Sequence, residues 1–245
     1  KYNYNDKWIS YLLLRPSAIM LAFKLGLSLV STPKLGGWSP DDEASLEAWY
    51  QNKVGITLNG SDVSQWDDSS PNNLDMVQGT ASEQPSYASD TGYLAFVSAD
   101  KNNLQTVGQI SLAGDFTVGI RIYPSIAAAG TFLADNTTAN EFFKFTTASN
   151  LRIKIDGSTA NIALDSGTFG GDYLVITRAS DVFTLWQNGQ AQSGTPTLAG
   201  TTDIDAIGIR SVDTDGFDGT IGEIQIYSSS STELTANIND RLSTL

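Results

Sequence analysis

The stretch Phe217–Tyr227, FDGTIGEIQIY, decides the fold of this chain. Its last residues alternate, so that Ile224 and Ile226 lie on one face of an extended segment and polar side chains lie on the other. Side chains of a β-strand point to opposite faces in turn, so the alternation predicts a strand with one face toward a core. A short helix is predicted directly after it, because apolar residues follow at helical intervals at Leu234, Ile238, Leu242 and Leu245.

Short strands of the same kind recur from Leu46 onward. They are separated by about 8–12 residues, with Gly, Asn, Asp or Ser between them, which is typical of an antiparallel sandwich. Asn59-Gly60 and Asn188-Gly189 predict tight hairpin turns. The segment FTVGIRIYP places four apolar side chains on one face, at Phe116, Val118, Ile120 and Ile122. We therefore predict an all-β fold of two packed antiparallel sheets with a short C-terminal helix.

Composition excludes several kinds of chemistry. The 245 residues include no cysteine and no histidine, which excludes disulfides, Cys/His zinc sites, thiol nucleophiles and a Ser-His-Asp triad. A metal would have to be a hard cation held by oxygen atoms, with calcium the first candidate. The net charge of −13 disfavours nucleic acid and anionic membranes as partners.

The first 38 residues differ in character from the rest. Residues 8–30 are apolar but are interrupted by Arg15, Pro16 and Lys24, and the uninterrupted runs are shorter than the roughly 20 residues that cross a bilayer. We predict an apolar arm over residues 1–38, without a membrane span, and a sandwich domain over residues 39–245. At the junction, Ser39 and Asp42 around Pro40 predict one capped helical turn.

Several motifs together resemble the laminin-G-like, concanavalin A-like jelly rolls. In order along the chain they are LEAWYQ, VSQWDDSSPNN, QPSY at residues 84–87, FTVGIRIYP after Asp115, the hairpin YLVITRASDVFTLWQNGQ, and the closing segment from Phe217. The resemblance covers roughly 200 residues, and it implies a jelly-roll sandwich.

A narrower resemblance concerns FKLGLSLVSTPKLGGW (residues 23–38), the acidic segment after it and the sandwich. This order is similar to virion structural proteins of tailed bacteriophages, especially cyanophages. It implies a non-enzymatic capsid decoration protein or head or tail fibre on the virion exterior. Its arm would anchor to other virion proteins, and its jelly roll would face outward as a homo-oligomer or symmetric array and bind host-surface glycans. The alternative is a secreted bacterial carbohydrate-binding or adhesion module, and a weaker third class is a glycoside hydrolase or lyase.

The carboxylates do not form the array that glycoside hydrolysis needs. Hydrolases of this fold carry paired acids on one strand face, whereas Glu223 has Gln225 at the next position on its face. Glu141 has no acid two residues on, and the adjacent Asp67 and Asp68 would point apart. The protein is therefore predicted not to be an enzyme, and Glu223 to be an edge or surface carboxylate.

Acid-rich loops supply the candidate metal ligands. The segment SVDTDGFDG predicts a rim calcium site at Asp213, Asp215 and Asp218, with ordinary Asp-Gly turns as the alternative. It is not an EF-hand, because Gly222 stands where that loop requires a glutamate. Further acids occur in other loops at Asp62, Asp67, Asp68 and Asp135.

The aromatic side chains leave two roles open. Trp49, Trp66 and Trp186 are predicted to serve the core, since tryptophan buries a large area. A sugar-binding platform would need an exposed ring beside polar groups, and the candidates are Tyr50, Trp66, Tyr87 and Trp186. The sequence does not decide which of these rings faces water.

Overall fold

The computed structural model describes residues 37–125, 128–167, 169, 172–210 and 216–245. Within it, Ser39–Leu245 forms one compact unit. Of the predicted arm, residues 1–36 lie outside the described residues, so the arm stays a prediction. The capped turn at the start of the unit is confirmed as the 3₁₀ helix η1 (Pro40–Asp42), in which the Ser39 N–H donates to Asp42 Oδ2 at 3.0 Å.

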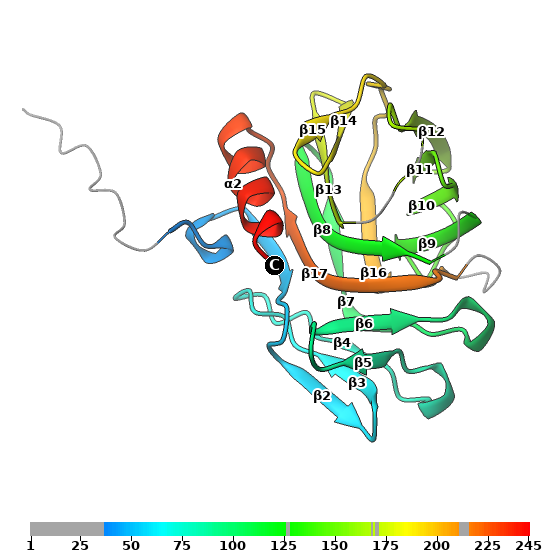
Figure 1. Ribbon diagram of the computed structural model, residues 1–245. Helices are drawn as coiled ribbons and strands as arrows, with labels where there is room; N and C mark the ends of the chain where they lie inside the picture. Colours follow the sequence, from blue (N-terminus) through cyan, green and yellow to red (C-terminus); the bar gives the residue numbers. More distant parts are fainter. Residues whose placement is uncertain (1–36, 126–127, 168, 170–171, 211–215) are drawn as a thin grey trace, which may run out of the picture. The chain divides into compact units, whose positions relative to one another are not determined.

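The unit is a sandwich of two antiparallel sheets (Figure 1), as predicted. In the first sheet, β17 is flanked by β8 on one edge and by β1 and β6 on the other. The sheet continues outward from β8 through β13, β14 and β15, and from β6 to β5. Its strands are β1 (Leu46–Tyr50), β5 (Ser86–Ala88), β6 (Tyr93–Phe96), β8 (Phe116–Pro124), β13 (Asp172–Ala179), β14 (Val182–Gln187), β15 (Gln190–Ala191) and β17 (Gly219–Tyr227).

The second sheet has the order β12-β11-β10-β9-β16-β7-β4-β3-β2. A single pair, Asp62 with Ser86, links β3 to β5 of the first sheet. Its strands are β2 (Ile56–Asn59), β3 (Asp62–Trp66), β4 (Met76–Val77), β7 (Leu104–Leu112), β9 (Ala128–Ala134), β10 (Phe142–Thr147), β11 (Asn150–Ile155), β12 (Ser158–Ala163) and β16 (Thr202–Ile207). Two further 3₁₀ turns, η2 (Ala81–Glu83) and η3 (Ser98–Asp100), lie between strands.

The core lies between the two sheets. The predicted apolar face of β8 is confirmed, because all four of its side chains, Phe116, Val118, Ile120 and Ile122, are fully buried. The second sheet contributes Phe132, Phe143 and Phe145 to the same cluster. Phe116 meets Phe143 edge-to-face at 6.2 Å between ring centroids, which is a favourable geometry for two aromatic rings.

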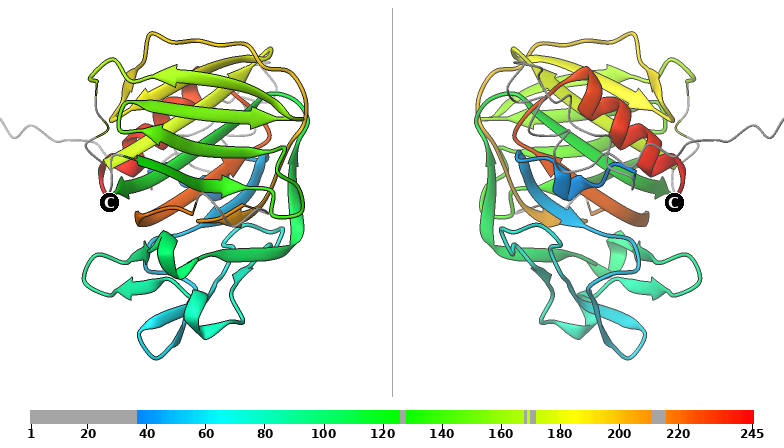
Figure 2. Two further views of the ribbon diagram at one scale, coloured as in Figure 1. Left: turned by 90° about the vertical axis from the view of Figure 1, so that its right-hand side faces the viewer. Right: turned by 90° about the vertical axis from the view of Figure 1, so that its left-hand side faces the viewer.

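The outer face of the first sheet is covered by α2 (Thr232–Ser243), the only α-helix among the described residues (Figure 2). The helix side chains Leu234, Ile238 and Leu242 are buried against this sheet, as their spacing predicted. Leu245 is 37% exposed, because the helix ends at Ser243 before reaching it. Gly119 on β8 makes this packing possible, since a Cβ there would lie 2.4 Å from Ile238 Cγ2.

The two predicted hairpin turns have different outcomes. Asn188 and Gly189 both have positive φ, 49° and 76°, and they connect paired residues Gln187 and Gln190, as a type I′ turn requires. The other turn is shifted by one residue. Asn59 pairs with Asp62 as a strand residue, and Gly60 supplies the positive φ of 70° at the first turn position.

The described residues contain no helix that is both long enough and apolar enough to span a membrane.

Candidate functional site

A cavity of ≈ 300 Å³ lies where α2 meets the hairpin of β14 and β15. It opens to solvent on the helix side, where several of its lining residues are exposed. The described residues that line it come from β13, β14, the hairpin turn and one face of α2: Tyr173, Trp186, Gly189, Thr232, Thr235, Ala236, Asn239, Asp240 and Ser243.

The hairpin side of the cavity supplies two aromatic rings. Trp186 and Tyr173 lie on the same outer face of the sheet, since Trp186 pairs with Val175, two residues after Tyr173. Asn188 in the turn holds the start of β13 through two hydrogen bonds: the Tyr173 N–H donates to Asn188 Oδ1, and the Asn188 N–H donates to the Tyr173 carbonyl, both at 3.1 Å. A Cβ on Gly189 would lie 3.4 Å from the Tyr173 hydroxyl, so the turn residue and the ring are close neighbours. The hairpin turn thus positions Tyr173, which is 9% exposed, beside the half-buried Trp186.

The helix side supplies polar groups. Positions 232, 235, 236, 239, 240 and 243 recur at spacings of three and four, which places them on one face of α2. The helix begins at a defined point, because the N-cap Ser231 Oγ accepts from the Leu234 N–H at 3.0 Å.

Asn239 is one of the residues of this wall, and one of its polar atoms has no partner among the described residues. Its amide group is oriented by the bond from Nδ2 to the Thr235 carbonyl at 2.8 Å. Its Oδ1 atom is buried, and among the described residues it accepts no hydrogen bond. A buried acceptor without a donor is costly and uncommon in folded proteins, and a ligand or a bound water could supply the donor.

Glu223 is not the edge or surface carboxylate that the sequence predicted. It is fully buried on β17, beneath α2. Oε1 accepts from Arg241 Nε at 2.6 Å and from Trp49 Nε1 at 3.0 Å, and Oε2 accepts from Arg241 Nη2 at 3.1 Å and from the Asn52 N–H at 3.2 Å. The sequence placed it on the correct face but did not show that a helix covers this face. Glu223 therefore anchors α2 to the sheet.

The other polar residues on this face of β17 extend the buried network. Gln225 Nε2 donates to Glu223 Oε1, and the Tyr227 hydroxyl donates to Gln225 Oε1, both at 2.8 Å. Burial raises the pKa of Tyr227 above its ordinary value, and repulsion by Glu43 and Glu223 adds to the effect. All three side chains on this face are structural.

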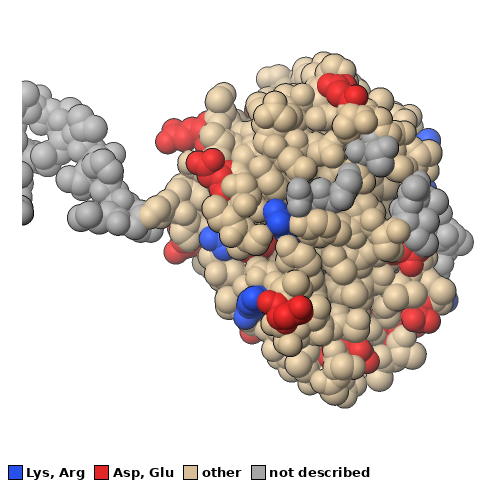
Figure 3. Space-filling view, in the orientation of Figure 1, with Lys and Arg blue, Asp and Glu red and all other residues tan. Residues whose placement is uncertain are grey.

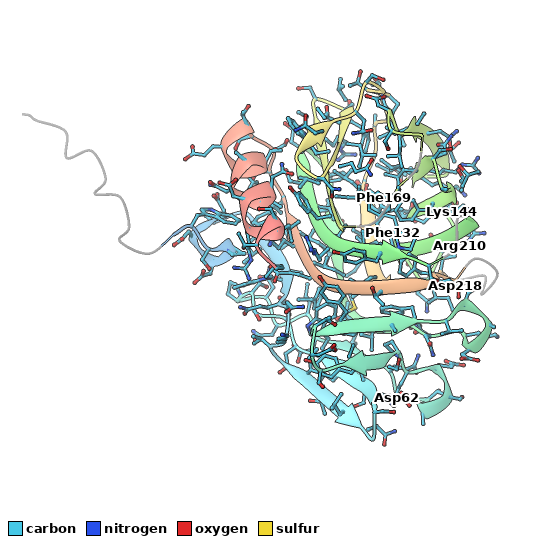
Figure 4. The ribbon with its side chains drawn as sticks, in the orientation of Figure 1. Asp62, Phe132, Lys144, Phe169, Arg210 and Asp218 are labelled. Carbon is cyan, nitrogen blue, oxygen red and sulfur yellow. The ribbon has the colours of Figure 1, made fainter. Side chains whose placement is uncertain are left out.

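The predicted calcium ligands are only partly described. Asp213 and Asp215 lie outside the described residues. Asp218 lies at the start of β17, at the opposite end of this strand from α2 (Figure 4), and its Oδ1 accepts from the Ser98 N–H at 2.9 Å. The described residues contain no cluster of three acidic side chains that could hold a metal ion. The rim calcium site stays a prediction.

Two acids of the other loops, Asp68 and Asp135, accept hydrogen bonds from backbone N–H groups. Asp62 and Asp67 accept from the side chains of Ser61 and Gln65. Asp68 Oδ1 accepts from the N–H groups of Trp49 and Ser70 at 2.9 and 2.8 Å, and its Oδ2 accepts from the Leu74 N–H at 3.0 Å. Asp135 Oδ1 accepts from the Thr137 N–H at 2.6 Å. These carboxylates are therefore occupied in organising loops.

The structure separates the aromatic candidates. Trp66 and Tyr50 are fully buried, and Tyr87 packs against the core. Trp49 is also buried, but on the outer face of the first sheet beside Glu223 and Arg241 and not in the core between the sheets. Trp186 is half-buried and lines the cavity, so of the three tryptophans predicted to serve the core only Trp66 does so. Tyr173 was not singled out from the sequence, because it stands at the start of a strand that reads as core.

Sequence comparisons identify no relative, and structural comparisons identify the fold. No protein-family model matches the chain, and no curated protein matches it. Domain 4 of AbnA, a GH43 extracellular arabinanase from Geobacillus stearothermophilus solved in complex with arabinotriose, is similar with a TM-score of 0.54 and 16% identity, over 81% of this chain and 98% of that one. Trypanosoma rangeli sialidase is similar with a TM-score of 0.51 and 14% identity, over 82% of this chain and 33% of that one.

The fold is a concanavalin A-like jelly roll. At these identities the likeness shows the fold alone, and this chain spans about one third of the length of the sialidase. The predicted jelly roll is confirmed.

The chemistry of the cavity suits binding. Asp240 is the single carboxylate among its described lining residues, so the cavity lacks the pair of acids that glycoside hydrolysis uses. Two aromatic rings opposite hydroxyl, amide and carboxylate groups are the combination that binds a small polar ligand with an apolar face.

Proposed function

We propose that the sandwich domain is a non-catalytic carbohydrate-binding module and that the cavity between α2 and the β14–β15 hairpin is its binding site. The observation that carries the proposal is the arrangement of Trp186 and Tyr173 across from Asn239, whose Oδ1 is buried without a donor among the described residues. A sugar ring presents C–H groups on its faces and hydroxyl groups at its edge. An aromatic ring can stack on the faces, and an amide acceptor can receive an edge hydroxyl.

The structural likeness supports this function. The arabinanase domain that is similar over most of its length was solved with arabinotriose, so the same fold binds a sugar in another protein. The net charge of −13 favours neutral sugars over anionic ones, because an acidic domain repels anionic ligands.

The virion role predicted from the sequence stays a prediction. Neither solved structure named above is a virion protein, and residues 1–36, through which attachment to other virion proteins was predicted, lie outside the described residues. Homo-oligomerisation and a virion-exterior location likewise stay predictions. A carbohydrate-binding domain is compatible with that role and with the secreted adhesion module that was the alternative.

The test is a glycan array followed by calorimetric titration with the full chain. We expect Trp186→Ala to weaken binding of the best glycan by at least about fivefold, since truncating an aromatic anchor typically costs more than ~1 kcal/mol. Val182→Ala is the matched control, because Val182 lies on the outer face of the same strand, four residues from Trp186, and does not line the cavity. A folded Trp186→Ala variant that binds as tightly as the wild type would contradict the proposal, as would an array without a hit.

A further inference from the structure

Aromatic rings continue beyond the cavity along the outer face of the first sheet. Tyr173 pairs directly with Arg121 on β8, so the two side chains lie side by side on this face. Tyr123 is two residues further along β8 and shares the face. Tyr93 on β6 lies on the same side, because its neighbour Leu94 faces the core opposite Ile221.

Arg121 connects these rings into one structure. Its guanidinium carbon lies 5.5 Å from the centre of the Tyr123 ring and 6.0 Å from the centre of the Tyr173 ring, which are cation–π distances. Its Nε donates to the Tyr93 hydroxyl at 3.1 Å, and its Nη1 donates to the Leu242 carbonyl near the end of α2 at 2.9 Å. Arg121 therefore ties the rings to the end of the helix that forms the cavity wall.

Tyr93 and Tyr123 lie against each other across the intervening strand. Their ring centres are 5.6 Å apart and their planes differ by 27°. The strand between them is β17, where Gly222 leaves room for Tyr93: a Cβ at Gly222 would lie 2.3 Å from Tyr93 Cε1. Both rings are half-buried, so each keeps part of its surface in contact with solvent.

We propose that the half-buried rings of Trp186, Tyr123 and Tyr93, joined by the largely buried Tyr173 between them, form one aromatic strip, and that the strip binds a chain of several neutral sugar residues rather than a single terminal sugar. This inference rests on the proposed function of the cavity. The strip crosses from β14 through β13, β8 and β17 to β6. Four steps between neighbouring strands of ~4.8 Å span roughly 19 Å, which is several times the width of one sugar ring.

The charges around the strip favour a neutral chain. The positive charge of Arg121 is already engaged by the Tyr93 hydroxyl, the Leu242 carbonyl and two rings, while Asp240 adds a negative charge at the cavity end. On the face of the domain seen in Figure 3, Asp and Glu outnumber Lys and Arg, in keeping with the net charge of −13. A uronic acid or sulfate group would be repelled by Asp240 and by the net charge of the domain.

The test measures how affinity depends on chain length. Arabino-, xylo-, cello- and manno-oligosaccharides of one to six units are titrated calorimetrically into the full chain. The strip predicts that affinity for the series that binds rises from the monosaccharide until the oligosaccharide spans the strip. A uronic-acid oligosaccharide of the same length is the charged comparison and is expected to bind more weakly.

Substitutions in the strip test the contribution of the Tyr123 end to binding separately from that of the cavity. Tyr123→Ala is expected to lower the affinity for the longest oligosaccharide by at least about fivefold and to leave the affinity for the shortest bound sugar unchanged. Tyr123→Phe keeps the ring and is expected to keep the affinity. Val107→Ala, at a fully exposed position on β7 of the other sheet, is the control that should change nothing. Melting temperatures verify that each variant is folded.

The outcomes distinguish this inference from the proposed function. If none of the four series binds at any length, or if Trp186→Ala has no effect, the proposed function fails. If Trp186→Ala abolishes binding but the affinity is the same for short and long chains, the strip is wrong and the cavity alone is the site. Equal binding of the longest oligosaccharide by Tyr123→Ala and the wild type, both folded, also overturns the strip.

Discussion

Glu223 and Arg241 form a bidentate ion pair between β17 and α2, with Nε–Oε1 and Nη2–Oε2 distances of 2.6 and 3.1 Å. The carboxylate is fully buried and the arginine side chain is 20% exposed. The guanidinium also lies 4.8 Å from the centre of the Trp49 ring, whose Nε1 donates to the same carboxylate. This cluster joins the C-terminal helix to the first strand and the last strand of the domain.

The first prediction concerns this ion pair. Glu223→Gln is expected to lower the free energy of unfolding by about 3–5 kcal/mol, because the substitution leaves Arg241 without its buried counter-charge. Arg241→Met keeps the apolar stem over Trp49 but leaves the carboxylate unpaired, so a similar loss is expected. Urea unfolding of both variants and of the double variant measures the coupling. If the free energy of unfolding that the double variant loses equals the sum of the losses in the two single variants, the ion pair has no coupling energy.

The same substitution tests the prediction that the protein is not an enzyme. Every oxygen of Glu223 is engaged by protein donors, so the residue is placed to hold the helix and not to meet a substrate. Activity on β-glucans that Glu223→Gln abolishes while the variant remains folded would contradict this prediction.

The second prediction concerns the closest contact between helix and sheet. Gly119→Ala places a methyl group where Ile238 Cγ2 lies 2.4 Å away and Leu242 Cδ1 lies 3.3 Å away. Overpacking of this kind costs roughly 1–3 kcal/mol, and we expect the displaced helix to weaken glycan binding as well. Gly79→Ala is the matched control, because nothing lies within 4 Å of a Cβ at that position. Equal melting temperatures for the two variants would contradict the packing described here.

Most of the sandwich could be predicted from local pattern. The alternation in FTVGIRIYP and EIQIY reports burial on one face, and the structure confirms it at Ile120 and Ile224. The strand β12 gives a weaker signal in the sequence, because STANIA has small and polar residues and only Ala160 and Ile162 are buried. The strand β7 gives no clear signal, because its apolar and polar residues do not alternate regularly.

The candidate site could not be predicted in the same way. Its two walls, Trp186 on β14 and Asn239 on α2, are 53 residues apart in sequence, and they meet because α2 folds back over the first sheet. The apolar residues of α2 recur at helical spacing in the sequence. The polar residues beside them have the same pattern as the solvent-exposed face of any surface helix. For the same reason Glu223 was assigned to the surface: a polar face of a strand predicts solvent unless another element covers it.

The third prediction concerns alkaline pH. Burial raises the pKa of both Tyr50 and Tyr227 above the ordinary value of 10.0, with repulsion from Asp68 and Glu43 as the respective next causes. In the unfolded chain both phenols ionise above about pH 10, whereas in the folded protein they stay protonated. Unfolding therefore releases protons, and stability falls as the pH rises, by up to about 1.4 kcal/mol per pH unit for each tyrosine.

The measurement is urea unfolding between about pH 8 and pH 11, below and above the ordinary tyrosine pKa. Tyr50→Phe and Tyr227→Phe each remove one hydroxyl hydrogen bond, to Leu74 and Gln225 respectively, so their stability is offset at every pH. The slope above pH 10 is the informative quantity, and it should be shallower in the double variant. An unchanged slope would show that other groups dominate alkaline unfolding.

The fourth prediction follows from the calcium site that the sequence indicates. If Asp213, Asp215 and Asp218 hold calcium, a chelator lowers the melting temperature of the wild type. Asp218→Ala should lower it with or without calcium, because the substitution also removes the acceptor of the Ser98 N–H, whereas Asp213→Asn should remove only the calcium-dependent part. A calorimetric titration without calcium-dependent heat, together with an unchanged melting temperature in chelator, would remove the site.

The fifth prediction uses Asn239 to separate binding from folding. Truncating a residue that serves packing lowers the free energy of unfolding of the protein. A buried acceptor without a donor among the described residues adds little to this free energy, so its removal should cost little. Asn239→Ala removes this acceptor together with the bond to the Thr235 carbonyl. We therefore expect the free energy of unfolding to change by less than about 1 kcal/mol, while glycan affinity falls by at least about fivefold.

Asn237→Ala is the matched control for this prediction, because Asn237 is on the same helix and does not line the cavity. It should leave both stability and affinity unchanged. If Asn239→Ala instead destabilises the fold by several kcal/mol and glycan binding persists, Oδ1 has a structural partner such as a bound water, and the polar wall of the cavity belongs to the fold. If stability holds and binding is lost, Asn239 serves the ligand and not the fold.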